Sequence, residues 1–340
     1  MTAEWWAEAE VTVPATSANL GPGFDCLGLA LEPRNRLLAR AADFTASRSW
    51  PDDTDIRVGV SGEGEGVFPE DRHNLVVRAM EQVFERAGTY PRKLEVSCQN
   101  GIPSCGGLGS SAAAIVGGCL AARALVGAGK EPGWLSEHDV LQIAARMEGH
   151  PDNVAAALLG GLTAAALGEK GSEGDERGGG GKVIVTRLPV SSDWLESFRV
   201  VLALPGVRLA TKAARAALPR TVAWEDAVFN VQRLALLVGA LAAGDEAMLG
   251  MGMADRLHQP YRLPLVPGLE QALDAARGTG ACAAAISGAG PAVISFVRGE
   301  NRAAGVGEAM LKAFRAAGVR ADWLMTRIEN SGAAWQARRP

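Results

Sequence analysis

The segment 102-IPSCGGLGSSAAAIVGG-118 decides the fold of this 340-residue chain. It runs through Gly106, Gly107 and Gly109 into two serines and then into small apolar residues, which predicts a glycine-rich turn leading into a buried helix that ends near Val126. The first N–H groups of a helix have no partner within it and carry partial positive charge, so bare amides at this point can bind phosphate. Tight packing is the alternative role, because glycine also permits close approach of two backbones.

The segment matches neither of two common nucleotide-binding loops. It lacks G-x-x-x-x-G-K-[ST], since no lysine follows the glycines, and it does not fit G-x-G-x-x-G. Ser110 and Ser111 add hydroxyl groups, which are usual ligands for phosphate-bound Mg²⁺. A phosphate site of another type is therefore the working interpretation.

Composition excludes several classes of protein. Hydrophobic residues make up 48% and charged residues 21%, and the net charge of −4 argues against a nucleic-acid binder, which needs a basic face. We expect no membrane partner, because no apolar run is expected to reach the length that spans one and the acidic start differs from a signal peptide. The five cysteines are odd in number and lack a C-x-x-C pair, so we expect neither disulfides nor zinc, and a cytoplasmic location.

Strand and helix patterns interleave along the chain, which predicts mixed α and β structure in two layers. Period-two patterns predict strands at residues 9–14, 56–62, 93–100 and 198–205, two strands around a glycine turn within 282–297, and a last strand at 320–329. Helical patterns cover residues 74–88, 103–126, 136–149, 210–218, 224–244, 268–278 and a segment ending near 317.

Two segments stand apart from these elements. The glycine-rich, charged stretch Gly168–Lys182 cannot form a core and is interpreted as a loop tip. Trp5 and Trp6 are interpreted as packing an N-terminal arm on the body of the protein or on a partner subunit.

Three further motifs, at residues 14–28, 148–161 and 287–296, favour a functional site. The first is interpreted as a polar loop, with Asn19 and Asp25 set among glycines. The third is a second glycine turn and another candidate anion nest. The second motif gathers four polar side chains beside an apolar wall: Glu148, His150, Asp152 and Asn153.

Together these segments resemble the homoserine kinases, members of the GHMP superfamily of small-molecule kinases, named for galactokinase, homoserine kinase, mevalonate kinase and phosphomevalonate kinase. "IPSCGGLGSSAA" is similar to the ATP-binding motif of the superfamily and "SGAGPAV" to its C-terminal glycine motif. "VPATSANLGPGFDCLGLAL" and "EGHPDNVAAALLGGL" are closer to homoserine kinases in particular. The resemblance covers about Val11 to Ile328.

The resemblance implies an α+β fold of two domains with ATP in the cleft between them. Residues 1–175 would form the N-terminal GHMP kinase domain, with a left-handed βαβ unit, and residues 176–340 a ferredoxin-like C-terminal domain. It implies phosphorylation of the side-chain hydroxyl of L-homoserine by ATP, with Mg²⁺, to give O-phospho-L-homoserine on the way to threonine. A homodimer is a possible assembly.

For the nucleotide, the resemblance implies a binding set around the glycine-rich segment. Mg²⁺ would take Ser111 and Glu148 as ligands. An alternative role for Asn74 is a cap for the helix that follows it, because asparagine favours such positions. The nucleotide-binding residues would be Asn74, Pro103, Ser104, Cys105, Gly106, Gly107, Leu108, Gly109, Ser110 and Ser111.

The amino-acid substrate is a zwitterion and needs partners of both signs. Its carboxylate suits Arg215 and Arg262, because a guanidinium offers paired planar donors, and its ammonium suits Asp25. These roles, too, follow from the resemblance. The remaining substrate contacts that it implies are Asn19, His150, Asn153 and Thr211.

The implied catalytic residues are Ser111, Glu148 and Asn153. Mevalonate kinase and galactokinase have an aspartate where this chain has Asn153, and asparagine cannot accept a proton at neutral pH. Our hypothesis is catalysis by positioning and charge neutralisation, with the hydroxyl proton passing to a phosphate oxygen, which a loose transition state tolerates. Asp152 is the alternative candidate for a base.

Two other functions were weighed against this one. A mevalonate-like kinase would need the aspartate base and an alcohol site without paired arginine and aspartate. A nucleotide-binding relative without catalysis would be expected to lose Ser111, Glu148 or the two arginines, all of which are present.

Overall fold

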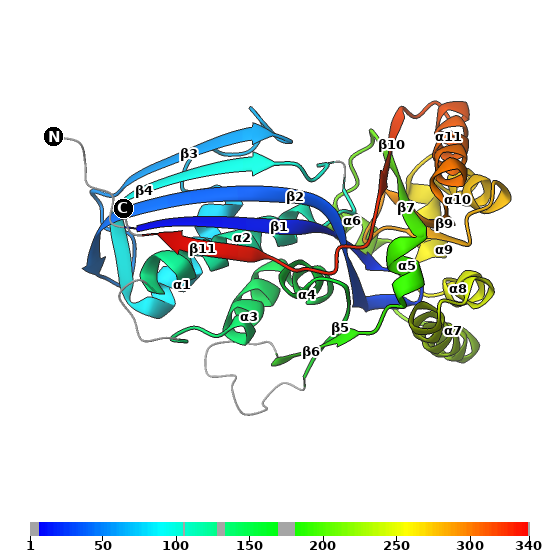
Figure 1. Ribbon diagram of the computed structural model, residues 1–340, viewed down its shortest axis with the longest axis horizontal. Helices are drawn as coiled ribbons and strands as arrows, with labels where there is room; N and C mark the ends of the chain where they lie inside the picture. The colour runs from blue at the N-terminus through cyan, green and yellow to red at the C-terminus, as the bar shows by residue number, and fades with distance from the viewer. Residues whose placement is uncertain (1–6, 105, 128–132, 169–180, 339–340) are drawn as a thin grey trace.

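The computed structural model describes residues 7–104, 106–127, 133–168 and 181–338. Trp5, Trp6, Cys105 and most of the Gly168–Lys182 stretch lie outside these residues, so the interpretations made for them stay predictions. The described chain forms two β-sheets, each flanked by helices, and the smaller sheet lies beyond one end of the larger (Figure 1).

The larger sheet has a central order β11-β1-β2-β4-β3, with β5 on the first part of β2 and β6 on β5. All its pairs are antiparallel except β3 with β4, which are parallel and connected through α1 (Leu75–Ala87), giving the expected βαβ unit. Its left-handed crossover stays a prediction. The strands are β1 (Ala7–Asn19), β2 (Gly23–Ala46), β3 (Asp55–Gly62), β4 (Thr89–Asn100), β5 (Leu162–Leu167), β6 (Val183–Leu188) and β11 (Ala334–Arg338).

Helices cover one face of this sheet, as Figure 1 shows: α1, α2 (Ser110–Gly127), α3 (Glu137–Glu148) and α4 (Asp152–Leu159). The ends of α1 and α3 follow sequence signals. Gly88 ends α1 in the left-handed conformation, and Ser136 with Asp139 forms a reciprocal capping box on α3.

The helix expected from residue 103 begins only at Ser110, which corrects the sequence interpretation. Gly106, Gly107 and Gly109 have φ angles of 93°, 86° and 64°, which a right-handed helix cannot contain. The segment between Pro103 and Ser110 is therefore a loop.

The smaller sheet has the order β10-β7-β9-β8, with every pair antiparallel. With α10 (Leu269–Gly278) and α11 (Glu300–Ala316) it has β-α-β-β-α-β connectivity, which confirms the expected ferredoxin-like topology. Its side chains alternate between a cluster with α10 and α11 and the main core. Its strands are β7 (Phe198–Pro205), β8 (Ala283–Ile286), β9 (Val293–Arg298) and β10 (Ala321–Thr326).

Five further α-helices and a 3₁₀ turn fill the described segments around β7 and before α10, and all of them except α7 are short. The helix Glu246–Gly252 is followed by a segment that lies beside the turn between β1 and β2. In that segment, the carbonyl oxygen of Met253 would lie 2.2 Å from a Cβ added at Gly21. These helices are α5 (Ser192–Glu196), α6 (Thr211–Ala216), α7 (Trp224–Ala243), α8 (Glu246–Gly252), α9 (Gln259–Arg262) and the 3₁₀ turn Leu263–Leu265.

Two strand assignments from the sequence are wrong. The stretch 14–28, expected to be a polar loop, is mostly strand, with a short turn between the end of β1 and the start of β2. Its alternation is hidden because both faces are covered, so that even Thr16 and Ser17 are buried. The strand near 320–329 is also not the last one, because β11 follows it and pairs with β1.

β6 and β11 both belong to the larger sheet, although both follow the domain boundary expected near residue 175. That sheet therefore takes strands from both sides of the boundary, which itself stays a prediction.

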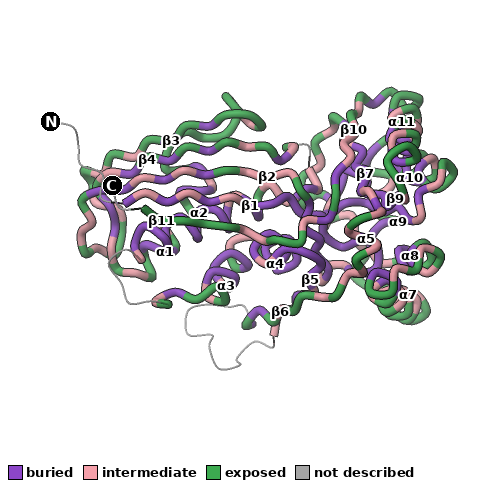
Figure 2. Tube along the Cα trace, in the orientation of Figure 1, coloured by how far each residue is buried: buried purple, intermediate pink, exposed green. Residues whose placement is uncertain are grey.

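Within the described residues, two helices are long and apolar enough to cross a membrane by length and composition alone, contrary to the expectation from sequence. α2 is a core helix, since 72% of its apolar window is buried. α7 is mostly outside the core, with Trp224 and Val231 78% and 70% exposed, and Figure 2 shows it largely in the colours of partial or full exposure. Such a pair is weak evidence for a membrane span, because core helices pass the same test.

Candidate active site

The glycine-rich loop combines both roles considered for it. A Cβ at Gly109 would lie 1.9 Å from Thr16 Oγ1 and one at Gly107 would lie 2.5 Å from Ser287 O, so these glycines allow close packing. Within the described ranges, the N–H groups of Gly106, Gly107 and Gly109 have no acceptor. The loop thus packs against Thr16 and Ser287, and its glycines line the cavity with N–H groups that can bind a ligand.

A single cavity is lined by nearly all of the predicted site residues, although they come from both sheets. Asp152, the alternative candidate for a base, also lines it, as do Gly288 and Ala289 of the second glycine turn. Ala18 lines it too and was not predicted. The predicted residues that it brings together are Asn19, Asp25, Pro103, Ser104, Gly106, Gly107, Leu108, Gly109, Ser110, Ser111, Glu148, His150, Asn153, Thr211, Arg215 and Arg262.

Asn74 lies in a neighbouring, more apolar cavity, which shares Ser104, Ser110 and Ser111 with the first. Its side chain caps α1 by accepting from Val76 N at 2.9 Å, as the alternative interpretation predicted. It also donates to Pro69 O at 2.7 Å. Contact with a bound base remains compatible with this position, because the residue still lines the cavity.

Ser111, in the first turn of α2, lies beside Glu148, the last residue of α3. The Ser111 hydroxyl donates to Glu148 Oε2 at 2.7 Å. Burial raises the pKa of Glu148, and the hydrogen bond from Ser111 and the nearby His150 offset this only in part. A half-buried carboxylate and a hydroxyl are hard oxygen donors, so the pair fits Mg²⁺, which is usually held by few protein ligands together with phosphate and water.

The turn that joins β1 and β2 holds its polar residues in an uncommon backbone conformation. Asn19, Leu20 and Asp25 have φ angles of 72°, 50° and 54°, which non-glycine residues seldom adopt. Asn19 Oδ1 accepts from Asp25 N at 3.0 Å, and Asn19 Nδ2 donates to Gly288 O at 2.7 Å. The Asp25 carboxylate faces Arg215 and receives two hydrogen bonds from it, of 2.7 and 2.8 Å.

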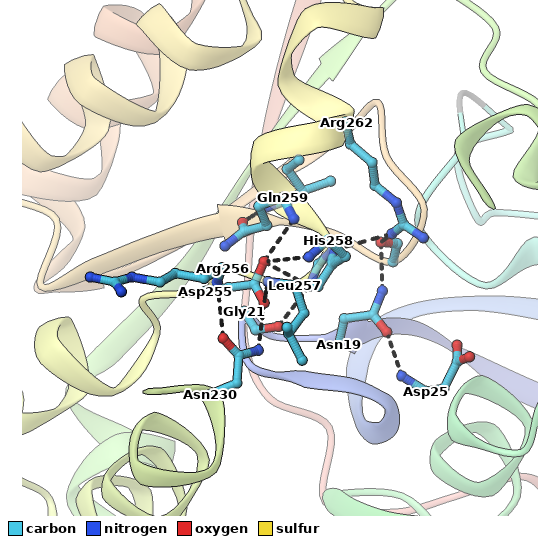
Figure 3. A network of polar contacts seen from close by, with 12 residues as sticks. Asn19, Gly21, Asp25, Asn230, Asp255, Arg256, Leu257, His258, Gln259 and Arg262 are labelled. Carbon is cyan, nitrogen blue, oxygen red and sulfur yellow. Dashed lines mark hydrogen bonds and ion pairs between the residues drawn. The ribbon is translucent and has the colours of Figure 1, made fainter. Parts of the chain in front are cut away.

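Arg262 is 2% exposed and lines the same cavity. Its Nη1 donates to Gly288 O at 3.0 Å, while its Nε has no partner (Figure 3). Burial lowers the pKa of this guanidinium, and the nearby Arg215 lowers it further. Among the described residues no carboxylate forms an ion pair with Arg262, so a buried cation faces the cavity in need of an anion.

The motif at 148–161 orients three side chains at the start of α4. His150 Nδ1 lies 2.6 Å from Asp152 Oδ1, which also accepts from Asn153 N at 2.7 Å. Burial lowers the pKa of His150, but the hydrogen bond to Asp152 and the charges of Asp152, Glu148 and Asp25 together raise it by more, so the net direction is upward. Asn153 Oδ1 accepts from Thr16 Oγ1 at 2.7 Å, which fixes the direction of the amide.

Sequence reasoning missed several residues that support the site. Thr16 and Phe24 lie in the misassigned 14–28 stretch, and nothing in the pattern marks Thr16 as a partner of Asn153. Phe24 lies against both arginines, with its ring centroid 5.6 Å from Arg215 Cζ and 5.2 Å from Arg262 Cζ. His258 was missed as well. It stands four residues before Arg262, and this i, i+4 spacing was a signal that the two side chains lie together.

Comparison with known families gives two matches. The family model for the GHMP kinases N terminal domain matches residues 74–161, and the one for GHMP kinases C terminal matches residues 237–316.

Named relatives cover nearly the whole chain. A homoserine kinase of Moorella thermoacetica is 43% identical over 310 residues, which are 91% of this chain and 94% of the relative. A homoserine kinase of Carboxydothermus hydrogenoformans is 40% identical over 95% of both chains. The crystal structure of homoserine kinase from Cytophaga hutchinsonii matches with a TM-score of 0.78 at 28% identity, covering 99% of this chain and 98% of that one. A mevalonate kinase structure, at 13% identity and a TM-score of 0.61, shares the fold.

Proposed function

This chain belongs to the homoserine kinases of the GHMP kinase family, and we propose that it transfers the terminal phosphoryl group of ATP to the side-chain hydroxyl of L-homoserine. The product is O-phospho-L-homoserine, an intermediate of threonine biosynthesis. One observation carries the proposal: the free amides of the glycine-rich loop and the charges of Asp25, Arg215 and Arg262 line the same cavity.

The distribution of charge supports an amino-acid acceptor over an uncharged alcohol. A zwitterion presents a carboxylate and an ammonium on the same carbon, and the cavity offers the guanidiniums of Arg215 and Arg262 beside the Asp25 carboxylate. A hydroxy acid such as mevalonate has no ammonium group, so Asp25 would have no cation of the ligand to bind. The neighbouring apolar cavity beside Asn74, Phe68 and Pro69 suits the adenine base.

The site residues then divide the work of phosphoryl transfer. The N–H groups from Gly106 to Ser111 bind the phosphate oxygens, and Ser111 with Glu148 would hold Mg²⁺, which neutralises charge on the triphosphate when bound. Arg262 and Arg215 orient the acceptor through its carboxylate, and Asp25 through its ammonium. Thr211 and Asn19 complete this wall of the cavity.

Asn153 is proposed to orient the acceptor hydroxyl for in-line attack. With its Oδ1 held by Thr16, the amide has a fixed direction toward the cavity. The hydroxyl proton passes to a phosphate oxygen, since Asn153 cannot accept it. The Asp152 carboxylate is engaged by His150 and by Asn153 N, which favours an orienting role for it over that of a base.

An ATP-consumption assay with Mg²⁺ tests the proposal. L-homoserine, L-threonine, L-serine and mevalonate are compared as acceptors with the purified protein, and product is identified by mass spectrometry. We expect homoserine to give a kcat/KM at least about tenfold above each of the others. Equal or higher turnover with another acceptor would refute the substrate assignment and leave the kinase family intact.

Three further properties belong to the same proposal. A cytoplasmic location is supported by Cys26, Cys98, Cys119 and Cys282, which are free thiols. A domain boundary near residue 175 would be tested by limited proteolysis. A homodimer would be tested by light scattering, with the outer side of α7 as the surface to mutate, because its apolar side chains are exposed.

A further inference from the structure

A buried polar cluster lies beside the substrate end of the cavity, in the segment between α8 and α9 (Figure 3). At its centre the Asp255 carboxylate accepts from Asn230 Nδ2 at 2.7 Å and from three main-chain N–H groups at 2.7 to 3.1 Å. Those groups belong to Leu257, His258 and Gln259, so Asp255 fixes the backbone that carries His258.

His258 has no exposed surface, and its two ring nitrogens face different partners. Nε2 lies 2.7 Å from the carbonyl oxygen of Gly21, which can only accept, so Nε2 carries the proton. Nδ1 lies 3.4 Å from Arg262 Nη1, which can only donate, so Nδ1 is the acceptor. One neutral imidazole tautomer therefore satisfies both the β1–β2 turn and the buried arginine.

The ring also packs face to face on Phe24, with centroids 5.0 Å apart. Phe24 directly precedes Asp25 in the strained turn. His258 thus contacts the turn at two places, through Gly21 and through Phe24.

A second path joins the same two parts of the site. Arg262 Nη1 and Asn19 Nδ2 both donate to Gly288 O, at 3.0 and 2.7 Å. Asn19 in turn holds the main chain of Asp25. The contacts form a closed circuit from His258 through Arg262, Gly288 and Asn19 back to the turn that His258 touches.

We propose that His258 is a positioning residue for the acceptor: it sets the distance between Arg262, which binds the carboxylate, and the Asn19–Asp25 turn, which binds the ammonium. This inference rests on the proposed function. It deepens it, because the separation of the two charges determines which amino acids fit. An ordinary buried histidine, by contrast, would affect stability alone.

The competing structural role predicts a different response to substitution. A residue that only fills the core would weaken folding and both substrates alike when replaced. A positioning residue acts through Arg262, so its effect should fall on homoserine and should vanish when Arg262 is absent.

The test is a double-mutant cycle with His258→Leu, His258→Gln and Arg262→Gln, measuring kcat and the KM values for homoserine and ATP. Leucine supplies neither donor nor acceptor, whereas glutamine supplies one of each. We expect His258→Leu to raise the homoserine KM by about tenfold or more with the ATP KM within about twofold. His258→Gln should recover at least about half of that effect on a logarithmic scale.

In the Arg262→Gln background, either change at His258 should alter the homoserine KM by less than about twofold. His138→Gln is the matched control, because His138 is an exposed residue of α3 whose one hydrogen-bond partner in the described part of the chain is Gln142. If His258→Leu does not fold, as judged by thermal unfolding, the cycle with His258→Gln decides the question.

The inference is overturned if His258 variants that fold leave the homoserine KM within about twofold of wild type, or if their effect is as large without Arg262 as with it. Absence of homoserine turnover in the wild-type protein would instead overturn the proposed function, and this inference with it.

Discussion

The carboxylate of Asp25 and the guanidinium of Arg215 pair with each other through two hydrogen bonds of 2.7 and 2.8 Å, across 190 residues of sequence. Asp25 is the proposed partner of the substrate ammonium and Arg215 of its carboxylate. The two side chains therefore neutralise each other before a zwitterion binds. Arg262 is the cation that lacks such a carboxylate in the described chain. The acceptor carboxylate should therefore depend most on Arg262, and the pair of Asp25 and Arg215 should enforce the presence of an ammonium.

Asp25→Asn should weaken discrimination in favour of acceptors that carry an ammonium. The comparison is between homoserine and 4-hydroxybutyrate, which has the same hydroxyl and carboxylate but no ammonium. We expect the ratio of their kcat/KM values to fall by about tenfold or more, because the variant loses the anion that the ammonium needs. Asp322→Asn, at an exposed position of β10, is the control, and an unchanged ratio in Asp25→Asn would contradict the assignment of Asp25.

Glu148→Gln should raise the Mg²⁺ concentration needed for half-maximal activity by about tenfold or more. The change keeps the shape of the side chain and removes the charge that the cation requires. The measurement is a Mg²⁺ titration at saturating ATP, and chelation with EDTA should abolish turnover in the wild type. Glu137→Gln at the exposed start of the same helix serves as control. A Mg²⁺ dependence identical to wild type would remove Glu148 from the metal site.

Gly109→Ala should cost more stability and activity than Gly88→Ala. Both glycines have positive φ, 64° and 66°, so alanine is strained by about 1–2 kcal/mol at either place. Only at Gly109 does the new Cβ meet a neighbour, Thr16 Oγ1 at 1.9 Å, which adds about 1–3 kcal/mol of overpacking. Urea unfolding measures the difference, and equal losses for the two variants would show that the loop can relax away from β1.

Acidification should destabilise the protein in part through His258. Burial lowers the pKa of His258 below 6.5, and Arg262 lowers it further, while Asp255 opposes both. Below pH 6.5 His258 therefore binds a proton in the unfolded chain, whereas in the folded protein it stays neutral down to its lowered pKa. The stabilising contribution is complete above that pH and is lost as pH falls through the folded pKa.

The difference between wild type and His258→Gln isolates this contribution from those of other titrating groups. The free energy of unfolding in urea should fall less in His258→Gln than in wild type between about pH 7.5 and about pH 5.5. His150 acts with the opposite sign, because its pKa is raised, but it is common to both proteins. Parallel pH profiles would contradict a neutral His258.

Thr16→Val should lower kcat by about tenfold while leaving the ATP KM nearly unchanged, because the variant frees the Asn153 amide to rotate. Thr163→Val is a matched control, since Thr163 is equally buried and its hydroxyl contacts Gly28 O away from the cavity. A normal kcat in Thr16→Val would mean that the orientation of Asn153 has no part in catalysis. Asn153→Ala, with loss of turnover but intact homoserine affinity, would make Asn153 more than an orienting group.

Local signals predicted the longer helices of this protein, but α4 and the full extent of β1 and β2 were not predicted. Ser136, Asp139 and Gly88 are caps whose effect is confined to a few residues, so they can be identified without the rest of the fold. The extent of β1 and β2 depends on partners far along the chain, and residues such as Ser17 became buried through contacts that no short pattern records. β11 was missed for the same reason, because its only strand partner is β1.

The candidate site shows the same division. The residues that would touch ligands stand in motifs that the sequence displays, and their expected roles follow from the resemblance of those motifs to a known family. Of the residues behind them, Thr16 and Phe24 have no distinctive type or spacing, and His258 is marked only by its spacing from Arg262. The folded structure is needed to explain their role.

The pairing of β1 with β11 has a consequence for how the protein is made. In Figure 1 these strands lie side by side, in a register that joins Glu8 to Arg338. During translation that edge of β1 stays open until β11 has left the ribosome, and an open edge favours pairing with other nascent chains. β1 is therefore synthesised long before β11, the strand that covers its edge. Slow elongation or premature termination would leave this edge open and favour aggregation through β1.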